Sequence, residues 1–199
     1  MARANVAIIN SGGANIASLQ FALERLGARS ELTADAGAIA AASHVILPGV
    51  GAAANAMSTL RRSRLDRLIP RLSQPVLGIC LGMQLLAEAS EEDQAECLGI
   101  VPATARRLHR SARHPVPHTG WAPVRPSQQH PLFRDIADDT YFYFLHSYAL
   151  PVAGYTLATT AHGQELSAAC ARDNFLATQF HPERSAAAGA RLLQNFLAL

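Results

Sequence analysis

The stretch PVLGICLGMQLL at residues 75–86 joins a short, continuous apolar run to an apolar pattern with helical spacing. The run before Cys80 has the length of a buried strand, and residues 82–89 have the pattern of a helix. Cys80 therefore falls at the corner between a predicted strand and a predicted helix. Gly78 and Gly82, two residues away on either side, allow the two backbones to approach closely. The stretch predicts a strand–corner–helix unit that exposes the Cys80 side chain.

The segments before this unit repeat the same alternation. Strands are predicted at residues 5–10 and 44–47, and helices at 16–26 and over the alanine- and arginine-rich segment that ends near residue 72. Continuous apolar strands between helices are typical of a parallel sheet that is covered on both faces. We therefore expect an α/β fold with three αβα layers and a mainly parallel, doubly wound, flavodoxin-like sheet.

The sequence pattern changes after residue 98, where short β-like runs are separated by Pro, Gly and His residues. These runs predict strands that add to the sheet in antiparallel fashion, at 98–103, 141–145, 155–160 and 166–171. A further strand is predicted at 175–180, at the edge of the sheet. A final helix is predicted at 185–199, and an exposed loop at 106–118. Residues 1–199 are expected to form a single domain.

Composition excludes several classes of function. The 17 basic residues are all arginine, so chemistry that needs a lysine, such as a Schiff base or a P-loop, is excluded. The formal charge of +2 argues against nucleic acid as a partner. The three cysteines form no CxxC pair, and the N-terminal apolar run is too short for a signal peptide or a membrane span. A cytoplasmic protein with no membrane association is expected.

Cys80 is the candidate nucleophile. Free backbone N–H groups and the positive end of the dipole at the start of the following helix favour a thiolate. The same N–H groups can stabilise an oxyanion. The alternative is a buried cysteine at a strand end, and the strand before and helix after Cys80 favour the nucleophile.

The segment QFHPE at residues 179–183 supplies a candidate base. In an extended segment, residues two apart face the same side, so His181 and Glu183 can share one face, and Pro182 stiffens the backbone between them. An imidazole can take the thiol proton while a carboxylate orients the ring. The alternative is a structural histidine beside a surface glutamate. The chain order nucleophile, base, acid differs from that of α/β-hydrolases and argues against an esterase.

These residues resemble the class I, triad-type glutamine amidotransferases, and most closely the glutaminase subunits of imidazole glycerol phosphate synthases. The resemblance covers nearly the whole chain. It is carried by five segments in family order: LPGVG at 47–51, PVLGICLGMQLL at 75–86, VPHTGW at 116–121, YFYFLHSY at 141–148 and QFHPERS at 179–185.

The resemblance implies hydrolysis of glutamine with Cys80 as nucleophile, His181 as base and Glu183 as its orienting acid. No cofactor and no metal are implied. The other implied roles are an oxyanion hole from the backbone of Val50 and Leu81, with Gly49 and Gly51 in the same loop, and a glutamine site from Gln84, Ser147 and Tyr148.

The resemblance also implies a partner. This would be a (β/α)₈-barrel cyclase that forms a heterodimer with the chain and receives its ammonia through a tunnel, in histidine biosynthesis. Trp121 and Arg184 are the candidate contacts. Departures from the family pattern at residues 10–15, at 52–53 and at Thr119 leave the triad intact and put only the coupling to the partner in doubt.

Three rival functions stay open on the residues alone. One is a glutaminase for another synthase, of anthranilate or of pyridoxal phosphate, and another is a free-standing cysteine hydrolase. The third is a scaffold without activity, which the intact triad disfavours. No metal site is expected at His109, His114 and His118, since they lack convergent spacing. Cys97, Cys170 and His146 are interpreted as structural.

Overall fold

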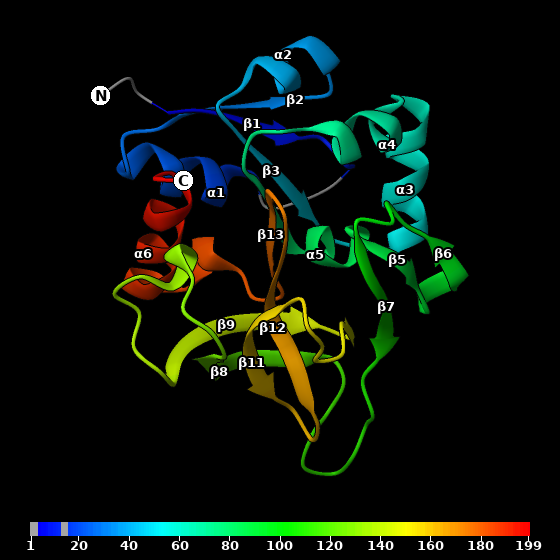
Figure 1. Ribbon diagram of the computed structural model, residues 1–199. Helices are drawn as coiled ribbons and strands as arrows, with labels where there is room; N and C mark the ends of the chain where they lie inside the picture. The colour runs from blue at the N-terminus through cyan, green and yellow to red at the C-terminus, as the bar shows by residue number, and fades with distance from the viewer. Residues whose placement is uncertain (1–3, 13–15) are drawn as a thin grey trace.

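A parallel sheet forms the centre of the molecule. The computed structural model describes residues 4–12 and 16–199. Five parallel strands lie side by side in the order β2-β1-β3-β4-β13 (Figure 1). They are β1 (Asn5–Ile9), β2 (Arg29–Thr33), β3 (His44–Gly49), β4 (Val76–Cys80) and β13 (Phe175–Thr178). This is the flavodoxin-type order 2-1-3-4-5, so the expected doubly wound sheet is confirmed.

Antiparallel strands extend the same sheet beyond β13, as expected. They follow in the order β12 (Glu165–Arg172), β11 (Thr156–Ala161), β8 (His118–Pro126) and β9 (Thr140–His146). A second, four-stranded sheet was not expected from the sequence, and the run at 98–103, predicted as an antiparallel addition to the main sheet, instead overlaps a strand of this second sheet, so that prediction is wrong. The second sheet is built from β10 (Tyr148–Ala149), β7 (Val101–Arg107), β5 (Ala87–Ser90) and β6 (Ala95–Glu96).

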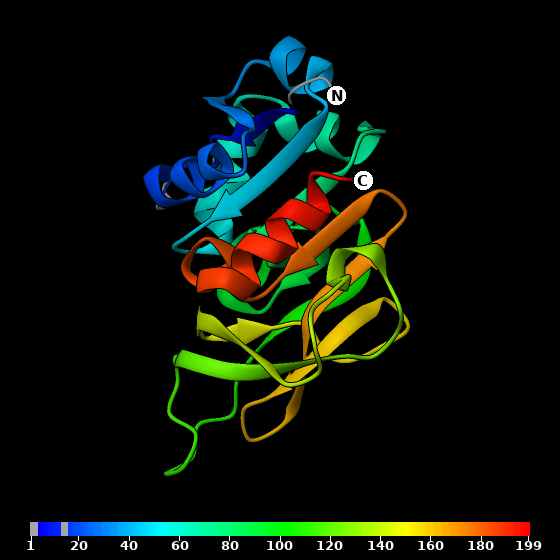
Figure 2. The same ribbon diagram turned by 90° about the vertical axis from the view of Figure 1, so that its left-hand side faces the viewer.

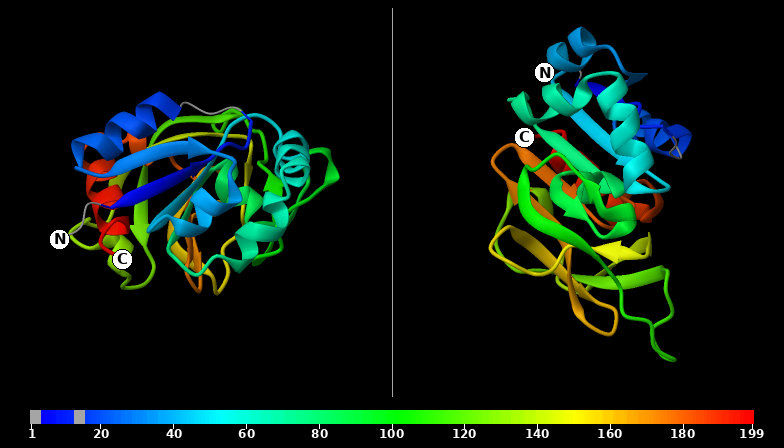
Figure 3. Two further views of the ribbon diagram at one scale, coloured as in Figure 1. Left: turned by 90° about the horizontal axis from the view of Figure 1, so that it is seen from above. Right: turned by 90° about the vertical axis from the view of Figure 1, so that its right-hand side faces the viewer.

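Helices cover both faces of the parallel strands (Figure 3). Helices α1 (Ile16–Arg25) and α6 (Ala186–Phe196) share one core with Val6, Ile8 and Ile46 of the strands. The alternate strand residues, such as Ile9 and Leu47, belong to a second core on the other face. That core includes side chains from α2 (Ala36–Ala41), α3 (Ala53–Arg62), α4 (Leu65–Leu68) and α5 (Leu81–Leu85). Short 3₁₀ turns complete the order: η1 (Ile69–Arg71), η2 (Glu92–Gln94), η3 (Pro131–Phe133) and η4 (Pro182–Arg184).

The helix predicted at 82–89 is wrong in its second half. Helix α5 ends at Leu85, and Ala87–Ser90 forms β5. Strand β5 pairs with β6 and β7, and this tertiary pairing overrides the local helical pattern. The helical segment expected to end near residue 72 is likewise interrupted, because Arg64 has a left-handed backbone with φ 58°.

The elements β2 and α2 were not predicted. Strand β2 was missed because it is a polar edge strand, RSELT, with few apolar residues. The loop expected at 106–118 is shorter than predicted. Strand β7 continues to Arg107 and β8 begins at His118, so residues 108–117 form the connection, which extends away from the body of the molecule (Figure 2).

The fold brings the carboxyl ends of three parallel strands to one edge. Gly49 at the end of β3 is paired with Cys80 at the end of β4, and β13 lies on the other side of β4. In open α/β sheets, ligands bind outside the carboxyl ends of the strands. The candidate site therefore lies where the parallel strands end and the antiparallel strand β9 approaches.

Candidate active site

Cys80 lies at a sharp corner between β4 and α5. Its backbone has φ 55° and ψ −109°, a strained conformation for a residue with a side chain. The flanking glycines are required by close packing. A Cβ on Gly78 would lie 2.8 Å from the carbonyl oxygen of Gly82, and a Cβ on Gly82 would collide with the carbonyl oxygen of Leu47. The glycines therefore allow the corner that presents the sulfur, for the reason inferred from the sequence.

The Cys80 sulfur has polar neighbours on two sides. It donates to the backbone carbonyl of Leu145 at 3.5 Å, and it accepts from the side-chain Nε2 of Gln179 at 3.7 Å. The side chain is buried yet lines a pocket. Because α5 has only five residues, its contribution to the sulfur comes from free N–H groups at its first turn and little from a macrodipole.

His181 follows β13 and is held from both the backbone and the ring. Its backbone N–H donates to the carbonyl of Tyr143 in β9 at 2.9 Å. Its ring Nδ1 lies 2.9 Å from Oε1 of Glu183. The two side chains meet because residues 182–184 form the 3₁₀ turn η4. The extended segment predicted for these residues is therefore wrong.

The surroundings of His181 favour its protonated form. Burial lowers the pKa of the imidazole, but hydrogen bonds to Cys80 and Glu183 and the negative charges of these two groups outweigh it and raise the pKa to about 10. The Glu183 side chain is only 6% exposed, and its Oε2 has no hydrogen-bond partner in the described part of the chain. A buried carboxylate with one bonded oxygen is thus committed to the imidazole.

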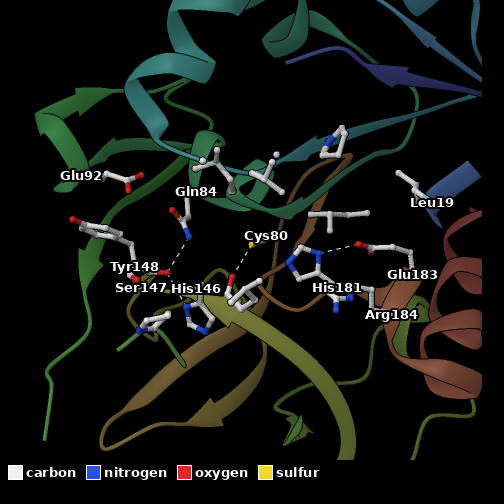
Figure 4. A pocket seen from close by; sticks show the side chains of 18 residues that line it. Leu19, Cys80, Gln84, Glu92, His146, Ser147, Tyr148, His181, Glu183 and Arg184 are labelled. Atoms are coloured by element: carbon white, nitrogen blue, oxygen red, sulfur yellow. Dashed lines mark hydrogen bonds and ion pairs between the residues drawn. The ribbon is translucent and has the colours of Figure 1, made fainter. Parts of the chain in front are cut away.

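These three side chains line a cavity of about 300 Å³. Figure 4 shows the Cys80 sulfur in the middle of the site, with His181 and Glu183 on one side and Gln84 and Tyr148 on the other. The remaining residues named as site candidates also line it: Gly49, Val50, Gly51, Leu81 and Ser147. Val50 is 44% exposed, at the rim.

Gln84 is buried, lines the pocket and is oriented by two acceptors. Its Nε2 donates to the carbonyl of Tyr148 at 2.9 Å and to Oε1 of Gln179 at 3.2 Å. Both amide hydrogens of Gln84 are therefore used by protein groups, and its Oε1 remains as the acceptor.

His146 approaches the same Tyr148 carbonyl from the other side. Its Nδ1 lies 2.9 Å from that oxygen, and its Nε2 lies 3.1 Å from Nδ1 of His118. Burial lowers the pKa of His146 to about 3 and that of His118 to about 4. Since a carbonyl can only accept, neutral His146 carries its proton on Nδ1 and accepts from His118 at Nε2.

Trp121 and Arg184 lie at one exposed surface of the β8–β9 hairpin. Trp121 is 51% exposed and packs edge-on against Tyr143, with ring centroids 6.2 Å apart. The Arg184 guanidinium lies over the Tyr143 ring at 4.3 Å. Tyr141 and Leu145 of β9 are also exposed. We call these five residues the hairpin face.

The departures from the family pattern that the structure describes do not contact the triad side chains directly, but two of them adjoin groups of the site: Thr119 pairs with Leu145, and Ala53 contacts Glu92. Thr119 is an exposed residue of β8. Ala53 is buried, and its backbone N–H donates to Oε2 of Glu92 at 2.9 Å. Of the 10–15 segment, residues 13–15 lie outside the described part of the chain.

Two polar residues of the site were missed from the sequence: Gln179, which contacts the Cys80 sulfur, and Glu92, which lines the pocket. Gln179 lies two residues before His181, so the face-sharing argument applied to Glu183 could have found it. Glu92 lies in η2, after the unexpected strand β5, and no local pattern connects it to Cys80. It is a carboxylate in the cavity on the opposite side of Cys80 from Glu183 (Figure 4).

The other two cysteines differ from Cys80. Burial raises the pKa of the Cys170 thiol to about 12 and that of the Cys97 thiol to about 11. Within residues 4–12 and 16–199, no group of three acidic, histidine or cysteine side chains could hold a metal ion. No helix of the described chain is long and apolar enough to cross a membrane.

Comparison with known proteins agrees with this geometry. Residues 7–199 match the family described as glutamine amidotransferase class-I. Two solved structures share the fold: PurLQS from Thermotoga maritima, with a TM-score of 0.77 at 16% identity over 98% of each chain, and a glutamine amidotransferase with a TM-score of 0.75 at 19% identity over 97% of each chain. The chain belongs to the class-I glutamine amidotransferase family.

More similar sequences are subunits of one synthase. The imidazole glycerol phosphate synthase subunit HisH of Photorhabdus laumondii is 49% identical over 98% of this chain and 99% of its own length. The HisH subunit of Vibrio cholerae is 48% identical over 98% of both chains. The resemblance inferred from the five sequence segments is therefore confirmed.

Proposed function

We propose that this chain is the glutaminase subunit of an imidazole glycerol phosphate synthase. It hydrolyses glutamine to glutamate and ammonia and passes the ammonia to a cyclase in histidine biosynthesis. The observation that carries the proposal is the pocket that holds the Cys80 sulfur beside His181, whose ring is bonded to the buried carboxylate of Glu183.

In the first half of the reaction, the proton of the Cys80 thiol moves to His181 and the sulfur attacks the carboxamide carbon of glutamine. The negative charge on the oxygen is stabilised by the backbone N–H groups of Leu81 and Val50. As the tetrahedral intermediate collapses, the C–N bond breaks and His181 returns its proton to the departing ammonia. A glutamyl thioester on Cys80 remains.

In the second half, His181 takes a proton from a water molecule that attacks the thioester. The C–S bond breaks, glutamate leaves, and the departing thiolate of Cys80 takes the proton from His181. Glu183 holds the ring with Nδ1 toward itself, so that the other ring nitrogen serves the sulfur and the water. One imidazole thus acts as acid and base in turn.

The other pocket residues account for binding of glutamine. Gln84 and the backbone of Ser147 and Tyr148 offer hydrogen bonds to the polar ends of an amino acid. Glu92, the carboxylate on the opposite side of Cys80 from Glu183, suits the positive α-amino group. The pocket therefore matches a substrate with an amide at one end and charged groups at the other.

The hairpin face is the proposed docking surface for the cyclase, a (β/α)₈ barrel that forms a heterodimer with this chain. Exposed aromatic residues and an arginine stacked on one of them are typical of interface cores. Residues 1–199 act as a single glutaminase domain in this complex, which is cytoplasmic.

Replacing Cys80 with alanine tests the proposal in the complex with the cyclase. We expect loss of imidazole glycerol phosphate synthesis from glutamine and unchanged synthesis from added ammonium, because only the source of ammonia is removed. The wild-type complex assayed with both nitrogen sources is the control. Loss of both activities, or glutamine-dependent synthesis that persists, would contradict the proposal. Co-purification with a different synthase would favour a sister glutaminase.

A further inference from the structure

We propose that Gln179 is a positioning residue that stabilises the Cys80 thiolate and at the same time orients Gln84. The proposal rests on the proposed function, since it concerns the same sulfur. Gln179 is 1% exposed and lies between β13 and His181. Its side chain spans the two groups: Nε2 is 3.7 Å from the Cys80 sulfur, and Oε1 is 3.2 Å from Nε2 of Gln84.

The orientation of the Gln179 amide follows from a backbone carbonyl. The Tyr148 oxygen can only accept, so Gln84 must present its NH₂ group there, at 2.9 Å. The second hydrogen of that NH₂ group then requires an acceptor, which is Oε1 of Gln179. The NH₂ group of Gln179 is thereby directed at the Cys80 sulfur. No other assignment of the two amides satisfies all three contacts.

A donor at this place acts on the charged form of the sulfur. The N–H of Gln179 bonds more strongly to a thiolate than to a thiol, whereas the carbonyl of Leu145 can bond only to the thiol. The two contacts therefore have opposite effects on the thiol proton. Gln179 favours its transfer to His181, and it does so from within the protein, independently of the substrate.

The same amide determines what Gln84 presents to glutamine. With both hydrogens of Gln84 held by Tyr148 and Gln179, its Oε1 is the acceptor left for a ligand. Loss of the Gln179 oxygen would free the Gln84 amide to rotate. Gln179 thus has two separable roles, one through its nitrogen and one through its oxygen.

Two variants separate these roles. Gln179→Glu keeps an oxygen for Gln84 but replaces the donor to sulfur with a negative group, and Gln179→Leu removes both. Gln74→Leu is the matched control, because Gln74 also donates a side-chain Nε2 to a carbonyl, that of Ile39 at 2.9 Å, and precedes the other end of β4. The readout is the rate of alkylation of Cys80 by iodoacetamide between pH 5 and 10, followed on the Cys80 peptide by mass spectrometry.

We expect both Gln179 variants to alkylate about tenfold more slowly at pH 7, with the midpoint of the pH profile moved up by about one unit. In the complex with the cyclase, KM for glutamine should rise in Gln179→Leu and change less than threefold in Gln179→Glu. Gln74→Leu should lose stability without a change in the profile. Profiles of both Gln179 variants that coincide with wild type would overturn the inference.

The alkylation readout needs neither glutamine nor the cyclase. A glutamine-dependent activity that survives Cys80→Ala would therefore refute the proposed function whatever the Gln179 variants show. An unshifted alkylation profile together with an inactive Cys80→Ala variant would refute only the role of Gln179.

Discussion

Two buried imidazoles border the same pocket, and their pKa values are shifted in opposite directions. His181, from the parallel half of the sheet, has a pKa raised to about 10, and His146, from the antiparallel half, has a pKa lowered to about 3. Both rings are buried, so burial alone does not separate them. The difference lies in their partners: the Cys80 sulfur and the Glu183 carboxylate raise the pKa of His181, whereas His146 bonds to a carbonyl and to another histidine.

This difference indicates which imidazole can act as an acid and base and which can only position its neighbours. An imidazole that gains a carboxylate can take and return a proton. An imidazole held neutral in one tautomer is instead a fixed donor on one side and a fixed acceptor on the other. His181 thus serves the proposed reaction, and His146 serves the shape of the pocket by holding the Tyr148 carbonyl.

The largest expected effect comes from removing the Glu183 carboxylate, one of the two groups that distinguish the His181 ring from the His146 ring. Glu183→Gln keeps the size of the side chain but lets it donate to Nδ1 of His181, which favours the wrong tautomer. We expect kcat for glutamine in the complex to fall by about 10² to 10⁴. Steady-state rates of glutamate release measure it.

The matched control is His146→Asn, which should change kcat by less than threefold. Asparagine can place its amide nitrogen near the position of Nδ1 and keep the bond to Tyr148. Equal losses of kcat in Glu183→Gln and His146→Asn would break the comparison, because both rings would then take part in the chemistry.

The second effect is on stability in acid. In the unfolded chain the histidines take up a proton as the pH falls below about 6.5, whereas folded His118 and His146 resist protonation down to about pH 4 and 3. The unfolded state therefore gains protons first, and stability is lost as the pH falls from about 6.5 toward these values. Each of the two contributes a loss of roughly 2 kcal/mol between pH 7 and 5.

The contribution of His181 to stability depends on pH in the opposite direction. Its raised pKa gives stability that is fully present below about pH 6.5 and is lost as the pH rises through about 10. Urea unfolding at pH 7, 6 and 5 measures the acid side, and His118→Asn keeps a donor for His146 while it removes one titrating group. We expect a shallower loss in His118→Asn. An unchanged slope would show that His118 is not held neutral in the folded chain.

The sequence predicted the two sides of the pocket unequally. The parallel half was accessible because its strands are continuous apolar runs, and the corner at Cys80 is marked by Gly78 and Gly82. The helical pattern of residues 82–89 hid β5 of the second sheet, and in the antiparallel half of the main sheet the expected loop included His118, which is the buried first residue of β8. In both places the structure is determined by pairing with other strands, and the local sequence pattern carries no information about that pairing.

The site shows the same limit. His181 and Glu183 are close in the chain, so their meeting could be predicted, although through an extended segment that is in fact a 3₁₀ turn. The bond between His118 and His146 joins residues 28 positions apart, and the bond between Gln84 and Gln179 joins residues 95 apart. No periodic pattern in the sequence predicts which distant residue a single glutamine or histidine will contact.

The smallest expected effect tests whether His146 has only a holding role. His146→Leu removes the N–H that donates to the Tyr148 carbonyl and leaves Gln84 as the donor. Loss of one such bond is equivalent to about 1 to 1.5 kcal/mol, so we expect KM for glutamine to rise about tenfold while kcat stays within twofold of wild type. In His146→Asn, which can restore the N–H, KM should rise less than threefold. If His146→Leu and His146→Asn raise KM equally, the N–H bond to Tyr148 is not what His146 contributes. If His146→Leu lowers kcat as much as Glu183→Gln does, His146 takes part in the reaction as His181 does.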